Sequence, residues 1–302
     1  MSEIQFMPKF SVIIASVNGL PTIAECLNAL ENQQGEHDAE IIVVDRTTDE
    51  TAEHIKTHFP KVKLIKSAEK VGIPELRAIG MKEAIGDFLI ITEDHCIAPE
   101  NWFSEFQTAH EKGYEVVGGA VENACRESLT DWATFLCEYS AFMPPINSGE
   151  TEFVAGNNVS YKRTAIEQVD DDIKTNYWEY FMQVELRRMN INFLAVPSIV
   201  VNHKKEFGFF YFLSQRFHYS RSFAAMRRQK STVSQQIFYV LYAPIAPFHL
   251  TWRIIQNVLR KKRNQKELLL SFPMLFVFMI VYAFGEFVGQ TFGSGNSLSK
   301  VE

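Results

Sequence analysis

One short apolar run that ends abruptly in acids and a histidine, residues 88–96, constrains the fold of this chain more than any other stretch. Four apolar residues lead directly into Thr92-Glu93-Asp94-His95, which is typical of a buried strand that stops at a polar edge. Charged groups beside a low-dielectric core cost free energy, and ligands of open α/β sheets bind at the carboxyl ends of the strands. The stretch therefore predicts either a site for Mg²⁺ or Mn²⁺, which carboxylate and imidazole groups suit, or a solvated turn.

The residues before this run alternate between short apolar strands and helical segments. Strands are predicted at 10–15, 40–44 and 62–65, and helices at 23–33, 52–58 and 74–84. This alternation predicts an α/β fold of three layers around a mostly parallel sheet. Asp45 follows the second strand as Glu93 follows the fourth, so both are expected at one edge of the sheet. The alternative for Asp45 is an N-cap of the next helix.

Charge is distributed unevenly along the chain. The net charge is −6, yet residues 204–266 contain thirteen Lys and Arg and a single acid. Residues 268–285 follow without a charge, close to the roughly 20 residues needed to cross a bilayer. Basic residues beside an apolar segment favour a membrane partner over nucleic acid.

We therefore expect basic amphipathic or interfacial helices at 206–266, a transmembrane helix at 267–292 and a disordered tail at 293–302. Whether residues 237–258 span the bilayer or lie in its interface is left open. A basic cluster at 260–263, before the transmembrane helix, predicts a catalytic domain on the cytoplasmic side of the cell (inner) membrane.

The order of these pieces resembles that of family 2 glycosyltransferases with the GT-A fold. Three segments and one tryptophan carry the resemblance: FSVIIASVN at 10–18, IIVVDRTTDET at 41–51, TEDHCIAP at 92–99, and Trp102. The resemblance implies a Rossmann-like GT-A domain, predicted here as residues 1–205, and a nucleotide-sugar donor, UDP- or GDP-linked. This chain departs from the family in having Asp45-Arg46 where two acids are usual, and in having Glu and His at the ends of the metal triplet.

The resemblance also implies the site residues. Metal ligands are expected at Glu93, His95 and His203, with Mn²⁺ or Mg²⁺ neutralising the diphosphate leaving group. Residues expected to bind the donor are Ser16, Asn18, Asp45, Asp94, Asn157 and Asn158. The alternatives are a structural histidine at 203 and a hairpin turn at 157–158.

The same resemblance implies a general base near the start of a helix predicted at 176–188. Glu179 stands at the matching position, after Trp178, and would deprotonate the acceptor hydroxyl in an inverting transfer. Glu185 is the rival base, and a favourable charge near a helix start is the alternative role for Glu179.

Together these features predict an inverting glycosyltransferase that moves a sugar to a lipid-linked or cell-envelope glycan acceptor at the cytoplasmic membrane face. The alternative is a catalytically degenerate GT-A-like membrane scaffold or binding protein. A nucleotidyltransferase would need a glycine-rich phosphate loop after the first strand, which residues 16–21 do not provide.

Overall fold

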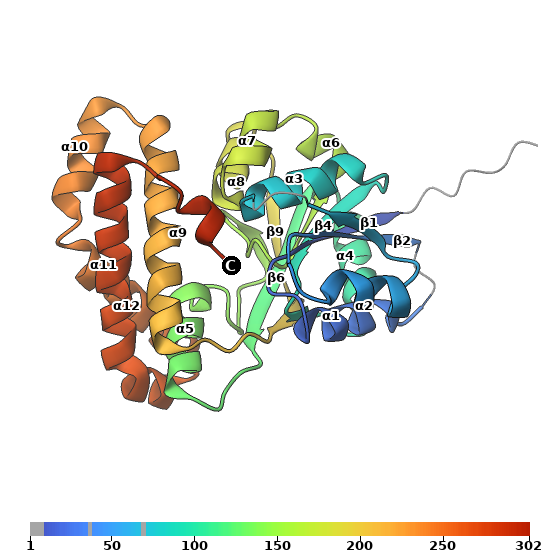
Figure 1. The fold of residues 1–302 in the computed structure, drawn as a ribbon, viewed down its shortest axis with the longest axis horizontal. Coiled ribbons are helices and arrows are strands. Elements are labelled where there is room, and N and C mark those ends of the chain that lie inside the picture. Colours follow the sequence, from blue (N-terminus) through green and yellow to red (C-terminus); the bar gives the residue numbers. More distant parts are fainter. Residues whose placement is uncertain (1–8, 36–37, 68–70) are drawn as a thin grey trace, which may run out of the picture. The chain divides into compact units, whose positions relative to one another are not determined.

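A computed structural model describes residues 9–35, 38–67 and 71–302 (Figure 1). The chain forms two compact units. The first contains residues 1–122 and 144–204, and the second contains residues 123–143 and 205–302.

The first unit is built around one nine-stranded sheet. Its strands are β1 (Phe10–Ser16), β2 (Ala39–Asp45), β3 (Lys63–Lys66), β4 (Phe88–Glu93), β5 (Cys96–Ile97), β6 (Val116–Asn123), β7 (Gly149–Thr151), β8 (Val159–Lys162) and β9 (Phe193–His203). The order across the sheet is β3-β2-β1-β4-β8-β6-β9-β5, and β7 pairs with β9.

The predicted α/β class is confirmed, and the sheet is mixed. β1, β2, β3 and β4 are parallel neighbours, and every residue of β1 is buried, as its apolar sequence predicts. The remaining described pairings, β4 with β8, β6 with β8, β7 with β9 and β5 with β9, are antiparallel. Strands β5, β7 and β8 have two to four residues, too few for a period of two to be recognised in the sequence.

Helices pack against this sheet. They are α1 (Thr22–Glu31), α2 (Thr51–His58), α3 (Ile73–Glu83), α4 (Trp102–His110), α6 (Arg163–Ile166), α7 (Asp171–Asn176) and α8 (Glu179–Arg188). Helix α3 packs on β1 and β2, and α4 packs on β9. Trp102 and Phe106 of α4 are completely buried, so the apolar face of this helix fills the core next to the site.

Strand β9 ends at His203, which lies at the carboxyl edge of the parallel strands. It is a single strand of 11 residues in which Pro197 is exposed, so the missing N–H of this proline costs no buried hydrogen bond. The far end of β9 pairs with β5, with Cys96 opposite His203. This pairing places His203 beside the end of β4.

The second unit is helical. Its elements are α5 (Leu129–Tyr139), α9 (Phe209–Gln229), α10 (Val233–Tyr242), α11 (Ala246–Lys261), α12 (Gln265–Phe292) and a 3₁₀ turn, η1 (Leu298–Lys300). Among the described residues, α12 is the one helix long and apolar enough to cross a membrane, judged by length and composition. It packs against α5, α9, α10 and α11, and 39% of its most apolar window is buried.

Two boundaries differ from the sequence-based expectation. Residues 123–143, expected within a domain at 1–205, belong to the helical unit, because α5 packs on α12. The tail at 293–302, expected to be disordered, contains η1 and buries Ser297 and Val301. Gln215 of α9 links the tail to the unit, because its side chain donates to the carbonyl of Lys300 at 3.3 Å and accepts from the N–H of Glu302 at 2.9 Å.

Candidate active site

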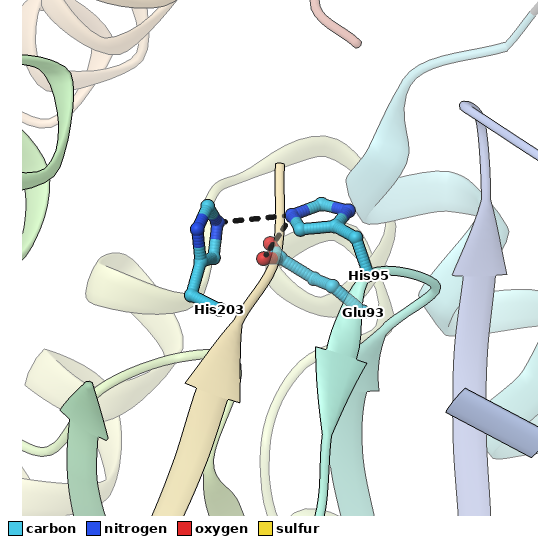
Figure 2. Close-up of side chains that lie close together, drawn as sticks. All are labelled: Glu93, His95 and His203. Carbon is cyan, nitrogen blue, oxygen red and sulfur yellow. Dashed lines mark hydrogen bonds and ion pairs between the residues drawn. The ribbon is translucent and has the colours of Figure 1, made fainter. Parts of the chain in front are cut away.

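Three side chains that could bind one metal ion meet at the carboxyl end of β4 (Figure 2). Glu93 is the last residue of β4, His95 follows in the turn to β5, and His203 ends β9. The Nε2 atom of His95 lies 3.0 Å from Nε2 of His203 and 3.3 Å from Oε2 of Glu93. The structure thus brings together the three residues that the sequence predicted as metal ligands.

His203 is held in register by backbone contacts. Besides the pairing of Cys96 with His203, the N–H of Lys204 donates to the carbonyl of His95 at 2.8 Å. The two rings meet edge to face, with centroids 4.6 Å apart. The orientation of His203 therefore depends on the antiparallel pairing of β5 and β9.

Asp94 holds His95 and a backbone loop of the site in place through hydrogen bonds. Its Oδ2 accepts hydrogen bonds from the backbone N–H groups of Val17, Asn18 and Gly19 at 2.9, 3.0 and 3.2 Å, and its Oδ1 lies 2.8 Å from Nδ1 of His95. Asp94 is completely buried. Protein groups thus contact both of its carboxylate oxygens, and the expected contact with the donor stays a prediction. Asp94 orients His95 and the loop between β1 and α1.

The electrostatics of the cluster favour the charged forms of its members. Burial opposes ionisation of Glu93, but its hydrogen bond to His95 and the charges of His95, Arg77 and His203 hold its pKa well below the usual range. Burial likewise opposes the charge on His95, yet the hydrogen bonds to Asp94 and Glu93 raise its pKa. The carboxylates of Glu93 and Asp94 thus stabilise a positive charge at His95.

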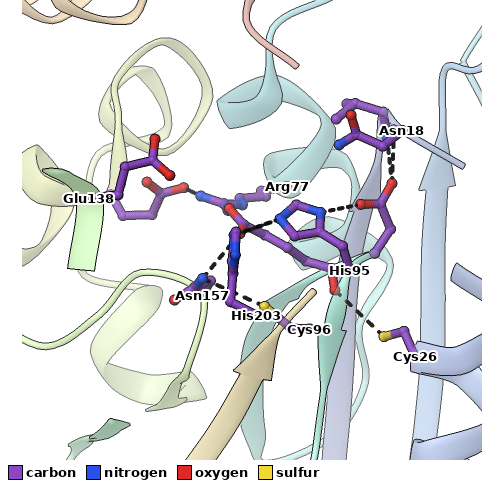
Figure 3. A network of polar contacts seen from close by, with 12 residues as sticks. Asn18, Cys26, Arg77, His95, Cys96, Glu138, Asn157 and His203 are labelled. Carbon is purple, nitrogen blue, oxygen red and sulfur yellow. Dashed lines mark hydrogen bonds and ion pairs between the residues drawn. The ribbon is translucent and has the colours of Figure 1, made fainter. Parts of the chain in front are cut away.

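Arg77, which the sequence reasoning missed, belongs to the network of polar contacts around His95 and His203 (Figure 3), and its ion pairs join this cluster to the predicted base. It projects from α3, is 3% exposed, and forms ion pairs with Glu93, at 3.0 Å, and with Glu179. Glu179 is the first residue of α8. A Cβ atom at Gly156 would lie 3.3 Å from Cγ of Glu179, so the glycine leaves room for this side chain. An arginine on the buried face of α3 is the sequence signal that could have revealed the link.

The rival base lies elsewhere. Glu185 pairs with Arg188 at 3.3 Å on the exposed side of α8, where Arg188 is 66% exposed. Trp178, in place of a second acid, is buried and caps α8. Of the two acids, Glu179 is the one connected to the metal-ligand cluster.

The two asparagines have different roles. The Nδ2 of Asn157 donates to Oε2 of Glu93 at 3.1 Å, which places Asn157 in the site. Asn158, whose expected contact with the donor stays a prediction, is bonded to the protein. It is completely buried, accepts from Nε1 of Trp102 at 3.0 Å, and donates to the carbonyls of Ala120 and Ile199 at 2.8 and 3.1 Å. These bonds fasten α4, β6 and β9 together.

The remaining predicted donor ligands lie at the ends of β1 and β2, whose last residues, Ser16 and Asp45, are paired in register. Asp45 is buried and accepts hydrogen bonds from Nζ of Lys66 at 2.7 Å and from the N–H of Thr47 at 2.8 Å. These bonds stabilise the end of β2. Asp45 is therefore not the N-cap residue of α2, a position that Glu50 occupies. Arg46 is buried and donates to the carbonyl of Val71, which gives it a structural role.

The cluster fits a divalent cation. Ligands about 2.1 Å from an octahedral ion lie about 3 Å apart, close to the separations of 3.0 and 3.3 Å from His95 to His203 and to Glu93. A metal-binding histidine ordinarily gives its other ring nitrogen to a carboxylate, as His95 does with Asp94. One carboxylate and two imidazoles suit Mn²⁺ better than Ca²⁺.

Comparison with known proteins identifies the family. The model of glycosyl transferase family 2 matches residues 11–170, which is more than half of the chain. The chain belongs to glycosyl transferase family 2. The match covers the parallel strands, Glu93 and His95, whereas Glu179 and His203 lie beyond it.

Characterised relatives match a smaller part. Mouse polypeptide N-acetylgalactosaminyltransferase 12 is 31% identical over 156 residues, which make up 48% of this chain and 24% of that protein. The rat transferase 10 is 29% identical over 108 residues, 33% of this chain and 18% of that protein. The alignments thus span about a quarter or less of the length of these relatives.

Solved structures share the fold over nearly the whole chain. TarS of S. aureus, residues 1–349, has a TM-score of 0.54 at 14% identity and covers 97% of this chain and 90% of its own. A mannosyltransferase of Pyrobaculum calidifontis, in complex with GDP-Man and Mn²⁺, has a TM-score of 0.59 at 15% identity, with coverages of 93% and 88%. The similarity confirms the predicted GT-A fold.

Proposed function

We propose that this chain transfers a sugar from a UDP- or GDP-sugar to an acceptor hydroxyl, with inversion at the anomeric carbon. One observation carries the proposal: Arg77 connects the cluster of Glu93, His95 and His203 to Glu179. Potential metal ligands and a potential base thus belong to one buried network. Similar structures support the donor class, since the mannosyltransferase is in complex with GDP-Man and Mn²⁺ and TarS has been solved with UDP-GlcNAc and with UDP.

The cluster would hold the divalent ion through Glu93, His95 and His203, with Mn²⁺ or Mg²⁺ as the candidates. Such an ion neutralises the charge that develops on a diphosphate leaving group. Asp94 fixes the tautomer of His95 by accepting from Nδ1, so that Nε2 faces the other ligands. Asn157 holds Oε2 of Glu93 in place.

Glu179 would act as the general base. Its carboxylate accepts the proton of the acceptor hydroxyl while the hydroxyl oxygen attacks the anomeric carbon and the bond to the diphosphate breaks. Arg77 orients Glu179 through their ion pair. A single carboxylate is sufficient, because the leaving diphosphate needs no protonation by an acid.

The nucleotide would lie along the ends of β1 and β2. Ser16 Oγ and Asn18 Nδ2 are buried and, within the described part of the chain, have no hydrogen-bond partner. Buried polar atoms of this kind cost free energy unless a ligand satisfies them. Asp45, at the adjacent strand end, would contact the base or ribose.

The acceptor is proposed to be lipid-linked or a cell-envelope glycan. The apolar helix α12 and the basic residues of 204–266 support a site of action at a membrane. The excess of basic residues before α12 supports the cytoplasmic face of the cell (inner) membrane, because that leaflet carries the anionic lipids.

A scaffold without turnover is not favoured. It was motivated by Glu and His at the ends of the metal triplet, and by Arg46 and Trp178 at positions where acids are expected. Both side chains are buried, Arg46 against the carbonyl of Val71 and Trp178 at the start of α8. These structural roles explain both replacements, and the proposed metal ligands and general base are other residues.

The test is release of nucleoside diphosphate from a panel of UDP- and GDP-sugars by detergent-purified protein, with membrane lipid extract as acceptor source. We expect turnover with Mn²⁺ or Mg²⁺, none with EDTA, and a loss of about 10²–10⁴-fold in Glu179→Gln with donor affinity retained. Glu185→Gln is the matched control and should remain active. Donor binding without metal-dependent turnover in the unmodified protein would support the scaffold instead.

A further inference from the structure

Helices α10, α11 and α12 present a large apolar surface, which we call the apolar face. Its members are large apolar side chains that are 38–75% exposed: Val233, Ile237, Phe238, Leu241, Ile245, Phe248, Trp252, Leu259, Leu269, Leu270, Phe272, Val277, Ile280 and Phe284. Helix α10 has no fully buried residue despite its apolar sequence. An exposed apolar area of this size marks an interaction surface.

Helix α11 shows how this face is bordered. Ile245, Phe248, Trp252 and Leu259 recur at helical spacing and are exposed, while Ala246, Thr251, Ile254 and Val258 are buried on the opposite side. His249, Arg253 and Arg260, each one position after an exposed apolar residue, are exposed as well. With 100° of rotation per residue along a helix, these three basic side chains form a stripe along one edge of the apolar face.

The position of this basic stripe distinguishes two possible orientations of α11 in a membrane. From His249 to Arg260 it extends about 16 Å along the helix axis, at 1.5 Å per residue. If α11 crossed the bilayer, these three polar side chains, two of them arginines, would be spread over about half of the ~30 Å hydrocarbon layer. If α11 lies flat, all of them sit at the depth of the lipid headgroups, as in interfacial helices with cations beside an apolar face.

Helix α12 is tied to a polar partner on its other side. Glu286 of α12 pairs with Arg227 of α9 at 3.0 Å, and Arg221 of α9 donates to the carbonyl of Gly293 at 2.9 Å. The helices approach closely, since a Cβ at Gly289 would lie 2.2 Å from the carbonyl oxygen of Arg221. If α12 crossed the bilayer, Arg221 and Arg227 of α9 would therefore have to enter the bilayer as well.

We propose that this chain binds one leaflet of a bilayer as a monotopic protein, with the apolar face in the interface and α12 lying along the membrane instead of crossing it. The partner is a lipid surface containing anionic phospholipid. Charge complementarity supports this choice, because residues 204–266 contain thirteen Lys and Arg and one acid. The inference is independent of the transfer reaction proposed above.

Topology provides the first test. Full-length protein with Asn296→Cys, an exposed position beyond α12, is compared with Lys112→Cys, an exposed position after α4. Both are expressed in a bacterium and labelled with a membrane-impermeant maleimide; the unsubstituted chain gives the background. We expect both cysteines to react in inverted membrane vesicles and neither in intact cells. Labelling of Asn296→Cys in intact cells would show that α12 spans and would overturn the proposal.

Flotation with phosphatidylcholine vesicles, with and without phosphatidylglycerol, provides the second test. Phe248→Ser/Trp252→Ser should lose binding to both vesicle types, while Ile85→Ser, an apolar residue 45% exposed in the first unit, should bind normally. Arg253→Gln/Arg260→Gln should lose about 30-fold in affinity for the anionic vesicles only, at about 1 kcal/mol for each arginine, and Lys56→Gln/Lys112→Gln should not.

Each remaining outcome overturns the proposal. Unchanged flotation of Phe248→Ser/Trp252→Ser, with the fold verified by circular dichroism, would show that the apolar face does not touch lipid. Failure of the unmodified protein to float, together with its sedimentation as a dimer, would identify a second copy of the chain as the occupant of this face.

Discussion

His95 and His203, 108 positions apart in the chain, face each other through their Nε2 atoms at 3.0 Å. One ring follows β4, and the other ends β9, which reaches the site because Cys96 pairs with His203 across an antiparallel ladder. Two imidazole nitrogens this close share one proton or one cation. With Oε2 of Glu93 at 3.3 Å from Nε2 of His95, a divalent ion would satisfy all three groups.

Asp94→Asn should weaken Mn²⁺ binding about 10–100-fold, because Asp94 orients a metal ligand without touching the ion. The NH₂ group of the asparagine would also point at another hydrogen-bond donor, either Nδ1–H of His95 or the backbone N–H groups of residues 17–19. Isothermal titration with Mn²⁺ measures the change. Asp49→Asn, at an exposed acid that caps Thr51, is the control, and equal affinities of the two variants would contradict the role given to Asp94.

Arg77→Met should lower the free energy of unfolding by about 3 kcal/mol, because it leaves Glu93 and Glu179 without their shared buried partner. Urea denaturation measures the loss. Arg188→Met removes an arginine from an exposed pair with Glu185 and should cost less than about 1 kcal/mol. Similar losses in the two variants would show that Arg77 does not hold the acids together.

Asn157 and Asn158 are neighbours whose replacement should have different consequences. Asn158→Ala leaves Nε1 of Trp102 and two backbone carbonyls unsatisfied and should destabilise the fold by about 2–4 kcal/mol, with metal affinity retained in the folded protein. Asn157→Ala should instead weaken Mn²⁺ binding through Glu93. Urea denaturation and metal titration of both variants decide the assignment, which fails if their effects are exchanged.

His110 should make stability depend on pH. Burial, opposed by a hydrogen bond to the carbonyl of Tyr114, lowers the pKa of His110 to about 4, and its Nε2 lies 2.8 Å from Oγ of Ser160. The unfolded chain, with a pKa of about 6.5, binds the proton more tightly, so stability present above pH ~6.5 is lost as the pH falls toward 4.

The loss attributable to His110 is up to about 3 kcal/mol. We expect His110→Gln, which does not titrate, to lose less stability than the unmodified protein between about pH 7 and about pH 4 in urea denaturation. Equal pH dependence of the two proteins would exclude His110 as a source.

Much of the first unit could be predicted because its parallel strands are continuous apolar runs that end in polar residues. Such runs located β1, β2 and β4 and, through β4, the cluster around Glu93 and His95. The antiparallel half was not predictable in the same way, since β5 and β7 have two and three residues and their pairing depends on tertiary contacts.

The sequence could not separate ligands from supports within the site. Asp94 and Asn158 have the chemistry of donor-binding residues, but each is completely buried and bonded to the protein. Arg77 showed no motif of its own, and its importance comes from the approach of α3 to the start of α8. Such roles depend on distances that residue types alone do not specify.

The most direct test of the metal-dependent site is a Mn²⁺ titration followed by electron paramagnetic resonance, with UDP or GDP present, on the unmodified protein and on His203→Ala. His203→Ala removes one ligand and leaves Asp94, Arg77 and the strand pairing in place. We predict one saturable Mn²⁺ site per chain in the unmodified protein and a loss of affinity of at least about tenfold in the variant. No saturable site, or an equal affinity in both proteins, would contradict the account.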